Sequence, residues 1–196
     1  GGVSGTTCAE ELRKRDTGAE ITILSEEHHP FYSRVLLPHY ITGKIPRERV
    51  FLKRDMWYGE QNIEWLPGVV AQYLDPKNKF VGGSNGREYA YDKLLIATGG
   101  EVRTIDEDLR GISYCRTLDD ADHFLQLLSE QGGSTRGLVY GSGFIACEYL
   151  NFFKHFEVPT TLVYRGSHFW SRSLEPQSGE LIANHIRSHG VDLHPL

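Results

Sequence analysis

The residues with the clearest chemical meaning are the glycines of the segment GSGFIA. Gly141, Gly143 and Ala146 complete a GxGxxA pattern. An apolar run at 137–140 precedes it and predicts a strand, and a stretch with helical periodicity follows at 144–156. Glycine lets the backbone approach a diphosphate closely, and the amides and dipole of a helix N-terminus favour phosphate. This context predicts a dinucleotide site rather than an ordinary tight turn.

A second glycine turn stands at the start of the chain. Gly2 and Gly5 fit the second and third glycines of such a pattern, whose first glycine and strand would precede the chain. A predicted helix at 6–15 and a predicted buried strand at 21–24 follow. Glycines at a chain end are by themselves more often a flexible terminus. The chain closes on another predicted strand at 191–193, so we expect a fragment cut through an element at both ends.

Charged residues after the second strand of each half bear on the ribose of a bound dinucleotide. A carboxylate roughly 20 residues after the glycines can accept the ribose hydroxyls. Glu26 stands at that distance with Glu27 beside it, and the alternative is a pair of solvated loop acids. In the second half the corresponding residues are Tyr164 and Arg165, with no acid. Arginine suits a 2′-phosphate, so NADPH, or both cofactors, is favoured over strict NADH.

Glu148 is the acid of the second glycine motif. It follows Ala146 by two residues and falls in the first turns of the predicted helix. A buried carboxylate there is costly unless it is paired, although an acid near a helix start can also simply favour the dipole. We interpret Glu148 as a functional residue.

Composition excludes several function classes. The 196 residues carry a net charge of −5, so nothing electrostatic points to nucleic acid as a partner. No apolar run approaches the roughly 20 residues that cross a bilayer, and no signal-like segment opens the chain. The three cysteines, at wide spacing, suggest neither a disulfide framework nor a zinc site. We expect a cytoplasmic protein without membrane contact.

The histidines do not complete a metal site either. His28 and His29 are adjacent in a polar stretch, and neither they nor His39 have the further cysteine or acid spacing that a tetrahedral site needs. No metal is therefore expected.

The segments between the two glycine motifs do not repeat the strand, glycine turn and helix of these motifs. They predict helices and short strands separated by turn clusters, followed by an apolar run that is typical of a buried parallel strand. The expected helices are 34–41 and 55–61, the expected meander strands are 63–66, 69–74, 79–81 and 88–91, and the apolar run is 93–97. The fold class is therefore α/β, with two Rossmann-like βαβ dinucleotide-binding domains and a small antiparallel meander. We place the domains at 1–104 and 105–196, both incomplete, with the irregular stretch 101–110 as the crossing.

The order of these motifs resembles the FAD-dependent pyridine nucleotide oxidoreductases. Within that family it is closest to the branch of NAD(P)H:rubredoxin oxidoreductases, ferredoxin reductases and the flavin domain of nitrite reductases. The resemblance covers nearly the whole chain and rests on GGVSG, ITILSEEHHPFYSRVLLPHYITGKIPRERVF, YDKLLIATGG, RTLDDAD, GSGFIACE and TLVYRG, in this order.

The resemblance implies roles for individual residues. Thr98 and Gly99 match a segment that closes over FAD, and Val70 matches a strand position whose backbone meets the adenine. Arg34 matches a basic residue, often lysine in rubredoxin reductases, beside the reactive edge of the flavin ring. Glu148 would approach the flavin from the nicotinamide side and pair with Arg34, and these two are the expected catalytic residues. The residues expected to bind FAD or NAD(P)H are Gly2, Ser4, Gly5, Glu26, Glu27, Arg34, Val70, Ala97, Thr98, Gly99, Gly141, Gly143, Phe144, Ile145, Glu148, Tyr164 and Arg165.

The resemblance also implies where the electrons go. Thiol-using relatives carry a redox cysteine in the region that corresponds to 31–40, and this chain has none there. Cys8 and Cys147 are expected to be small buried hydrophobes on the two motif helices. Electrons would therefore leave FAD for an external acceptor, such as a rubredoxin- or ferredoxin-like protein or a fused redox domain. A basic stretch over 44–54 could dock an acidic partner or simply be solvated.

Two further expectations concern the whole protein. The chain alone should bind FAD weakly and be inactive, because a later part of the FAD domain of this family would follow residue 196. The alternative to a reductase is a non-catalytic nucleotide-binding scaffold or sensor subunit. The acceptor and the oligomeric state stay open.

Overall fold

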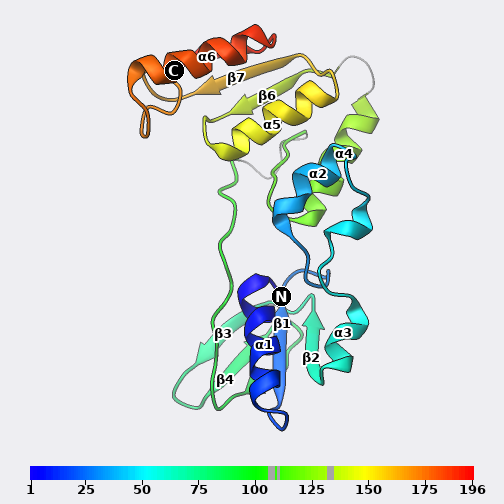
Figure 1. The fold of residues 1–196 in the computed structure, drawn as a ribbon. Helices are drawn as coiled ribbons and strands as arrows, with labels where there is room; N and C mark the ends of the chain where they lie inside the picture. The colour runs from blue at the N-terminus through cyan, green and yellow to red at the C-terminus, as the bar shows by residue number, and fades with distance from the viewer. Residues whose placement is uncertain (106–108, 110, 132–134) are drawn as a thin grey trace. The chain divides into compact units, whose positions relative to one another are not determined.

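The computed structural model describes residues 1–105, 109, 111–131 and 135–196 (Figure 1). The chain divides into two compact units. The first unit comprises Gly1–Arg34 and Pro46–Thr104, and the second comprises Val35–Ile45 and Ile105–Leu196. Part of the crossing expected at 101–110 lies outside the described residues.

The first unit is built on a short parallel sheet. Strand β1 (Ile21–Ser25) pairs in parallel with β2 (Ile63–Pro67), with Ile21 opposite Ile63. Parallel neighbours need a long connection. Here the connection contains the short helix α3 (Asp55–Glu60) and the 3-10 turn η2 (Arg47–Val50).

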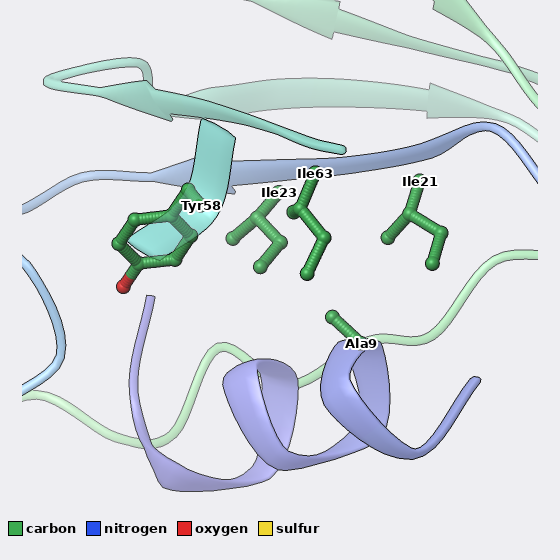
Figure 2. Close-up of a cluster of buried hydrophobic side chains, with 5 residues drawn as sticks. All are labelled: Ala9, Ile21, Ile23, Tyr58 and Ile63. Atoms are coloured by element: carbon green, nitrogen blue, oxygen red, sulfur yellow. The ribbon is translucent and has the colours of Figure 1, made fainter. Parts of the chain in front are cut away.

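Helix α1 (Val3–Arg15) packs on one face of this sheet. Figure 2 shows Ala9 of α1 facing Ile21, Ile23 and Ile63 of the two strands, with Tyr58 of α3 beside them. Every second residue of β1 is buried, which is the period of a strand with one face in the core. The strand expected at 21–24 is thus confirmed, and the helix expected at 6–15 begins three residues earlier.

The antiparallel meander has three strands. They are β3 (Ala71–Asp75), β4 (Phe80–Gly83) and β5 (Glu88–Ala90), in that order in the sheet. The segment 63–66, expected to be a fourth meander strand, is instead β2 of the parallel sheet. Its single buried isoleucine packs against α1, and burial of that side chain decides the pairing.

The apolar run at 93–97 forms no strand, which corrects the sequence prediction. Leu95 and Ile96 are 56% and 67% exposed. A strand requires a hydrogen-bonded neighbour, and the described residues provide none for this run. Apolar composition alone therefore predicted a pairing that is absent.

The second unit contains a complete βαβ motif. Strand β6 (Gly137–Tyr140), helix α5 (Phe144–His155) and strand β7 (Thr160–Tyr164) follow the sequence prediction closely. Helix α6 (Pro176–Ser188) then leads to β8 (Asp192–Pro195), and the parallel order is β6-β7-β8 (Figure 1). A Cβ on Gly137 would lie 2.6 Å from the ring of Phe153, so this glycine lets α5 pack tightly on β6.

Two more helices complete the second unit. The 3-10 turn η1 (Arg34–Leu36) leads into α2 (Leu37–Ile41), and Tyr40 of α2 donates a hydrogen bond of 2.6 Å to Asp122 of α4 (Leu118–Gln131). Neither α4 nor α6 was among the helices expected from the sequence. The start of α4 carries a reciprocal cap, in which the amide of Thr117 donates to Asp120 and the amide of Asp120 donates to the hydroxyl of Thr117.

The first prediction concerns the core in Figure 2. Ile63→Ala should lower the free energy of unfolding by about 3 kcal/mol, because it removes buried methyl groups between α1 and the sheet. Met56→Ala on α3, whose side chain is 64% exposed, should cost less than about 0.5 kcal/mol. Denaturant unfolding measures both, and equal losses would contradict the packing described.

Candidate functional site

The glycine turn of the second unit leaves the start of α5 open. Gly141 has a φ of +124°, which other residues rarely adopt, and Gly143 is the N-cap of α5. No side chain caps this helix, and no acid stands in its first turn. A Cβ built on Gly141 or Gly143 would meet no atom within 4 Å. Free amides beside open space fit the diphosphate of a dinucleotide. Phe144 and Ile145 flank the turn and are exposed.

The turn of the first unit has the same construction. Gly2 is the N-cap of α1, again without a capping side chain or an acid in the first turn, and there is open space beside it. The neighbouring Ser4 is exposed on α1. A Cβ built on Gly5 would lie 3.8 Å from the Cβ of Ala97, which is an ordinary van der Waals contact. Gly1 has no room for a side chain, since a Cβ would lie 2.1 Å from the hydroxyl of Ser25.

The two acids after β1 have different surroundings. Glu26 is exposed, whereas the side chain of Glu27 is 25% exposed and pairs with Arg34 at 2.6 Å. The other carboxylate oxygen of Glu27 accepts a hydrogen bond from the hydroxyl of Tyr32. Burial opposes the charge of Arg34, but Glu27 and Tyr32 outweigh it and raise the pKa of Arg34. Sequence reasoning missed Tyr32, because neither its type nor its spacing marked it as a partner of Glu27.

The remaining residues expected to bind FAD are also in the first unit. The backbone of Val70 forms two hydrogen bonds with Ser84. The amide of Val70 donates to the hydroxyl of Ser84 at 3.0 Å, and the amide of Ser84 donates to the carbonyl of Val70 at 2.8 Å. Thr98 and Gly99 are exposed, and Gly99 adopts a φ of +75°. Their contact with a cofactor stays a prediction.

Glu148 is half-buried on α5, close to two thiols. Burial, with Asp120 and Glu148 adding negative charge, raises the pKa of Cys115 to about 11. Burial followed by Glu148 likewise raises the pKa of Cys147. The expected pair of Glu148 with Arg34 joins the two units, and it stays a prediction.

At the end of β7 the only charged group is a cation. Tyr164 is buried and packs edge-on against Phe169, so its side chain belongs to the core. Arg165 is exposed, and its guanidinium lies 5.9 Å from the ring centre of Tyr140 on β6. The aromatic face gives the cation a favourable support at the edge of the sheet.

A cavity of about 580 Å³ lies elsewhere, between α5 and α6. Lys154, His185 and His189 are among its lining residues, but none of the residues expected to bind a cofactor is. The glycine turns, rather than this cavity, are the candidate site.

The described residues contain neither a candidate membrane span nor a candidate metal site. No helix among them has the length and apolar character of a membrane span. Within the same residues, no three histidine, cysteine, aspartate or glutamate side chains gather as a metal site requires.

Comparison with known proteins identifies the family. The model of the family described as "Pyridine nucleotide-disulphide oxidoreductase" matches residues 1–196. The chain belongs to this family. The family expected from the order of its motifs is thereby confirmed.

Two curated relatives are longer than this chain. A ferredoxin–NAD(+) reductase subunit of a benzene 1,2-dioxygenase system from Pseudomonas putida is 28% identical over 196 residues, 98% of this chain and 47% of that protein. A rubredoxin-NAD(+) reductase from Ectopseudomonas oleovorans is 27% identical over 195 residues, 97% of this chain and 50% of that protein. The chain thus spans about half the length of these relatives.

Solved structures with the same fold confirm the expected fold class. A ferredoxin reductase from Rhodopseudomonas palustris matches with a TM-score of 0.86 at 22% identity, over 99% of this chain and 48% of that one. A NADH:rubredoxin oxidoreductase from Clostridium acetobutylicum matches with a TM-score of 0.79 at 22% identity, over 89% and 46%.

The second prediction follows from the surroundings of the thiols. At pH 8 about one Cys115 in a thousand should be a thiolate, given a pKa of about 11. Cys8 is exposed, so the expectation that it is a buried hydrophobe is wrong. Iodoacetamide should therefore label Cys8 first and leave Cys115 unlabelled until the pH is raised or the protein is unfolded. Peptide mass spectrometry measures the order. Equal labelling of Cys8 and Cys115 in the folded protein would contradict it.

Proposed function

We propose that this protein is an NAD(P)H-dependent flavoprotein reductase, which takes a hydride from NAD(P)H onto FAD and passes electrons to an external acceptor. The supporting observation is that two helices of one chain, α1 and α5, each begin at an uncapped glycine turn with open space beside it. Membership of a family whose relatives include NAD(+)-linked reductases supports the same reaction.

FAD would bind to the first unit. The free amides at the start of α1, with Gly2, Ser4 and Gly5, would take its diphosphate, and Glu26 would take the ribose hydroxyls. The adenine would lie against the backbone at Val70. The remaining contacts would come from Ala97, Thr98 and Gly99.

NAD(P)H would bind to the second unit. Its diphosphate would lie at Gly141 and Gly143, with Phe144 and Ile145 beside it. Arg165, the cation at the end of β7, favours NADPH, because a 2′-phosphate needs a positive partner and the strand end has no carboxylate for a 2′-hydroxyl.

The hydride step itself is the chemistry of the two bound cofactors. The protein positions them, and Arg34 and Glu148 are the residues proposed to line the place where they meet. The half-buried Glu148 would orient the nicotinamide side, and Arg34 would supply positive charge on the FAD side.

We propose that the acceptor is a small electron-transfer protein of the ferredoxin or rubredoxin kind, or a fused redox domain. Relatives named for ferredoxin and for rubredoxin support this class of acceptor. The raised pKa values of Cys115 and Cys147 disfavour thiolate chemistry at either residue, so an internal disulfide is not the proposed route. A cytoplasmic setting accords with free thiols.

The third prediction separates binding from folding. Gly143→Ala should leave the free energy of unfolding within about 1 kcal/mol, because the residue has an extended backbone and open space around it. It should weaken NADPH binding at least about tenfold, because the methyl group would occupy the approach of the diphosphate. Gly137→Ala should do the reverse and destabilise the protein, since its Cβ would meet Phe153. Titration calorimetry and denaturant unfolding measure the two properties. Unchanged NADPH affinity in Gly143→Ala would argue against this site.

The fourth prediction tests the reductase reaction. Rapid mixing of the FAD-loaded, full-length protein that contains this chain with NADPH should bleach the flavin absorbance. Glu148→Ala should slow bleaching by about a hundredfold while changing NADPH affinity little, because a positioning role acts on the reacting ends of the cofactors. Glu130→Ala, which removes an exposed acid of α4, is the matched control and should bleach normally. Absence of bleaching in the unaltered full-length protein would leave only a nucleotide-binding scaffold.

A further inference from the structure

Both oxygens of the Glu27 carboxylate are engaged by neighbouring side chains. One oxygen accepts from the guanidinium of Arg34 at 2.6 Å, and the other accepts from the hydroxyl of Tyr32. A carboxylate has about four acceptor sites, so these two contacts leave Glu27 some capacity to accept ribose hydroxyls. They nevertheless fix its direction, because one contact is a charge-assisted pair and the other a half-buried hydrogen bond.

Tyr32 is itself held rigidly. It is buried, forms an antiparallel bridge with Phe51 and packs edge-on against that ring. The preceding residue is fixed as well, since the amide of Phe31 donates to the hydroxyl of Tyr58 at 3.0 Å and its carbonyl accepts from the amide of Leu52. The loop therefore fixes Tyr32, Tyr32 fixes Glu27, and Glu27 fixes the direction of Arg34.

This group of three side chains lies beside the first glycine turn. Ser25 lies directly against Gly1, and its hydroxyl donates to the backbone carbonyl of Glu27 at 3.1 Å. The turn is where the diphosphate of FAD would lie, and a carboxylate near two phosphates is unfavourable unless a cation accompanies it. Arg34 is that cation. Glu26, by contrast, is exposed, and its carboxylate has no hydrogen bond or ion pair in the described part of the chain.

We propose that the two adjacent acids divide the work at the FAD site. Glu26 binds the ribose hydroxyls, and Glu27 is a positioning residue that, with Tyr32, holds Arg34 toward FAD. This assignment rests on the proposed function in that it takes FAD as the ligand of the first unit. The new element is the role of Glu27, which the sequence pattern names only as a neighbour of Glu26.

The test compares FAD with its 2′-deoxyadenosine analogue, each titrated into the full-length apoprotein and followed by flavin fluorescence. The unaltered protein should prefer FAD by about tenfold, the value of one hydrogen bond to a charged group. Glu26→Gln should reduce that preference to about twofold. Glu27→Gln should keep the preference but weaken the binding of both ligands by about tenfold. Glu20→Gln, an exposed acid before β1, is the matched control and should change neither.

A double-mutant cycle tests the positioning role. The variant that combines Glu27→Gln with Arg34→Ala should lose as much FAD affinity as Arg34→Ala alone, because Glu27 acts through Arg34. Tyr32→Phe should weaken FAD binding by about threefold, because Glu27 then loses one of its two partners. This variant replaces Glu27→Gln in the test if Glu27→Gln does not fold. Two results would overturn the proposal. One is that Glu27→Gln loses the preference for FAD over the 2′-deoxyadenosine analogue. The other is that the double variant loses FAD affinity by the product of the two single losses. A protein that shows the expected FAD pattern yet is not reduced by NAD(P)H would instead refute the proposed function alone.

Discussion

A phosphate can approach the backbone amides at the start of a helix only where no side chain stands in the way. This constraint governs both halves of the molecule. Gly2 and Gly143 are each the N-cap of their helix, with an extended backbone, no capping side chain and open space at the Cβ position. A serine or aspartate cap would stabilise the helix more, so the uncapped amides are kept at a cost of several tenths of a kcal/mol. That cost is expected where a ligand takes the place of the cap.

The packing of each unit maintains these openings. In the first unit the buried hydroxyl of Thr6 donates to the carbonyl of Gly1, which fixes the turn against the start of α1. In the second unit Gly137 admits the ring of Phe153, which draws α5 onto the sheet and sets its first turn beside the end of β6. Small residues thus appear at two kinds of place, where the ligand approaches and where the helix must pack closely.

Much of this could be predicted from the sequence, and the failures have physical causes. The βαβ motif over 137–164 was predicted well because its strand, glycine turn and helix are local patterns. The run 93–97 failed because strand formation depends on a neighbour that local composition does not reveal. The segment 63–67 was assigned to the wrong sheet, since its parallel partner at 21–25 lies far away in the sequence. Helix α4 had a usable signal in the cap formed by Thr117 and Asp120, but its pattern was read only as a family motif.

The residues of the candidate site could likewise be predicted only in part. The glycines and the cation Arg165 follow from type and spacing, whereas the roles of Glu26 and Glu27 depend on which of them Tyr32 and Arg34 contact. We propose that two dinucleotides bound at these turns exchange a hydride. Mixing the FAD-loaded, full-length protein with NADPH that carries deuterium at the transferred position of the nicotinamide tests this exchange. Flavin bleaching should then slow by a primary isotope effect. Bleaching by this cofactor that shows no isotope effect at any NADPH concentration, or no bleaching at all, would contradict it.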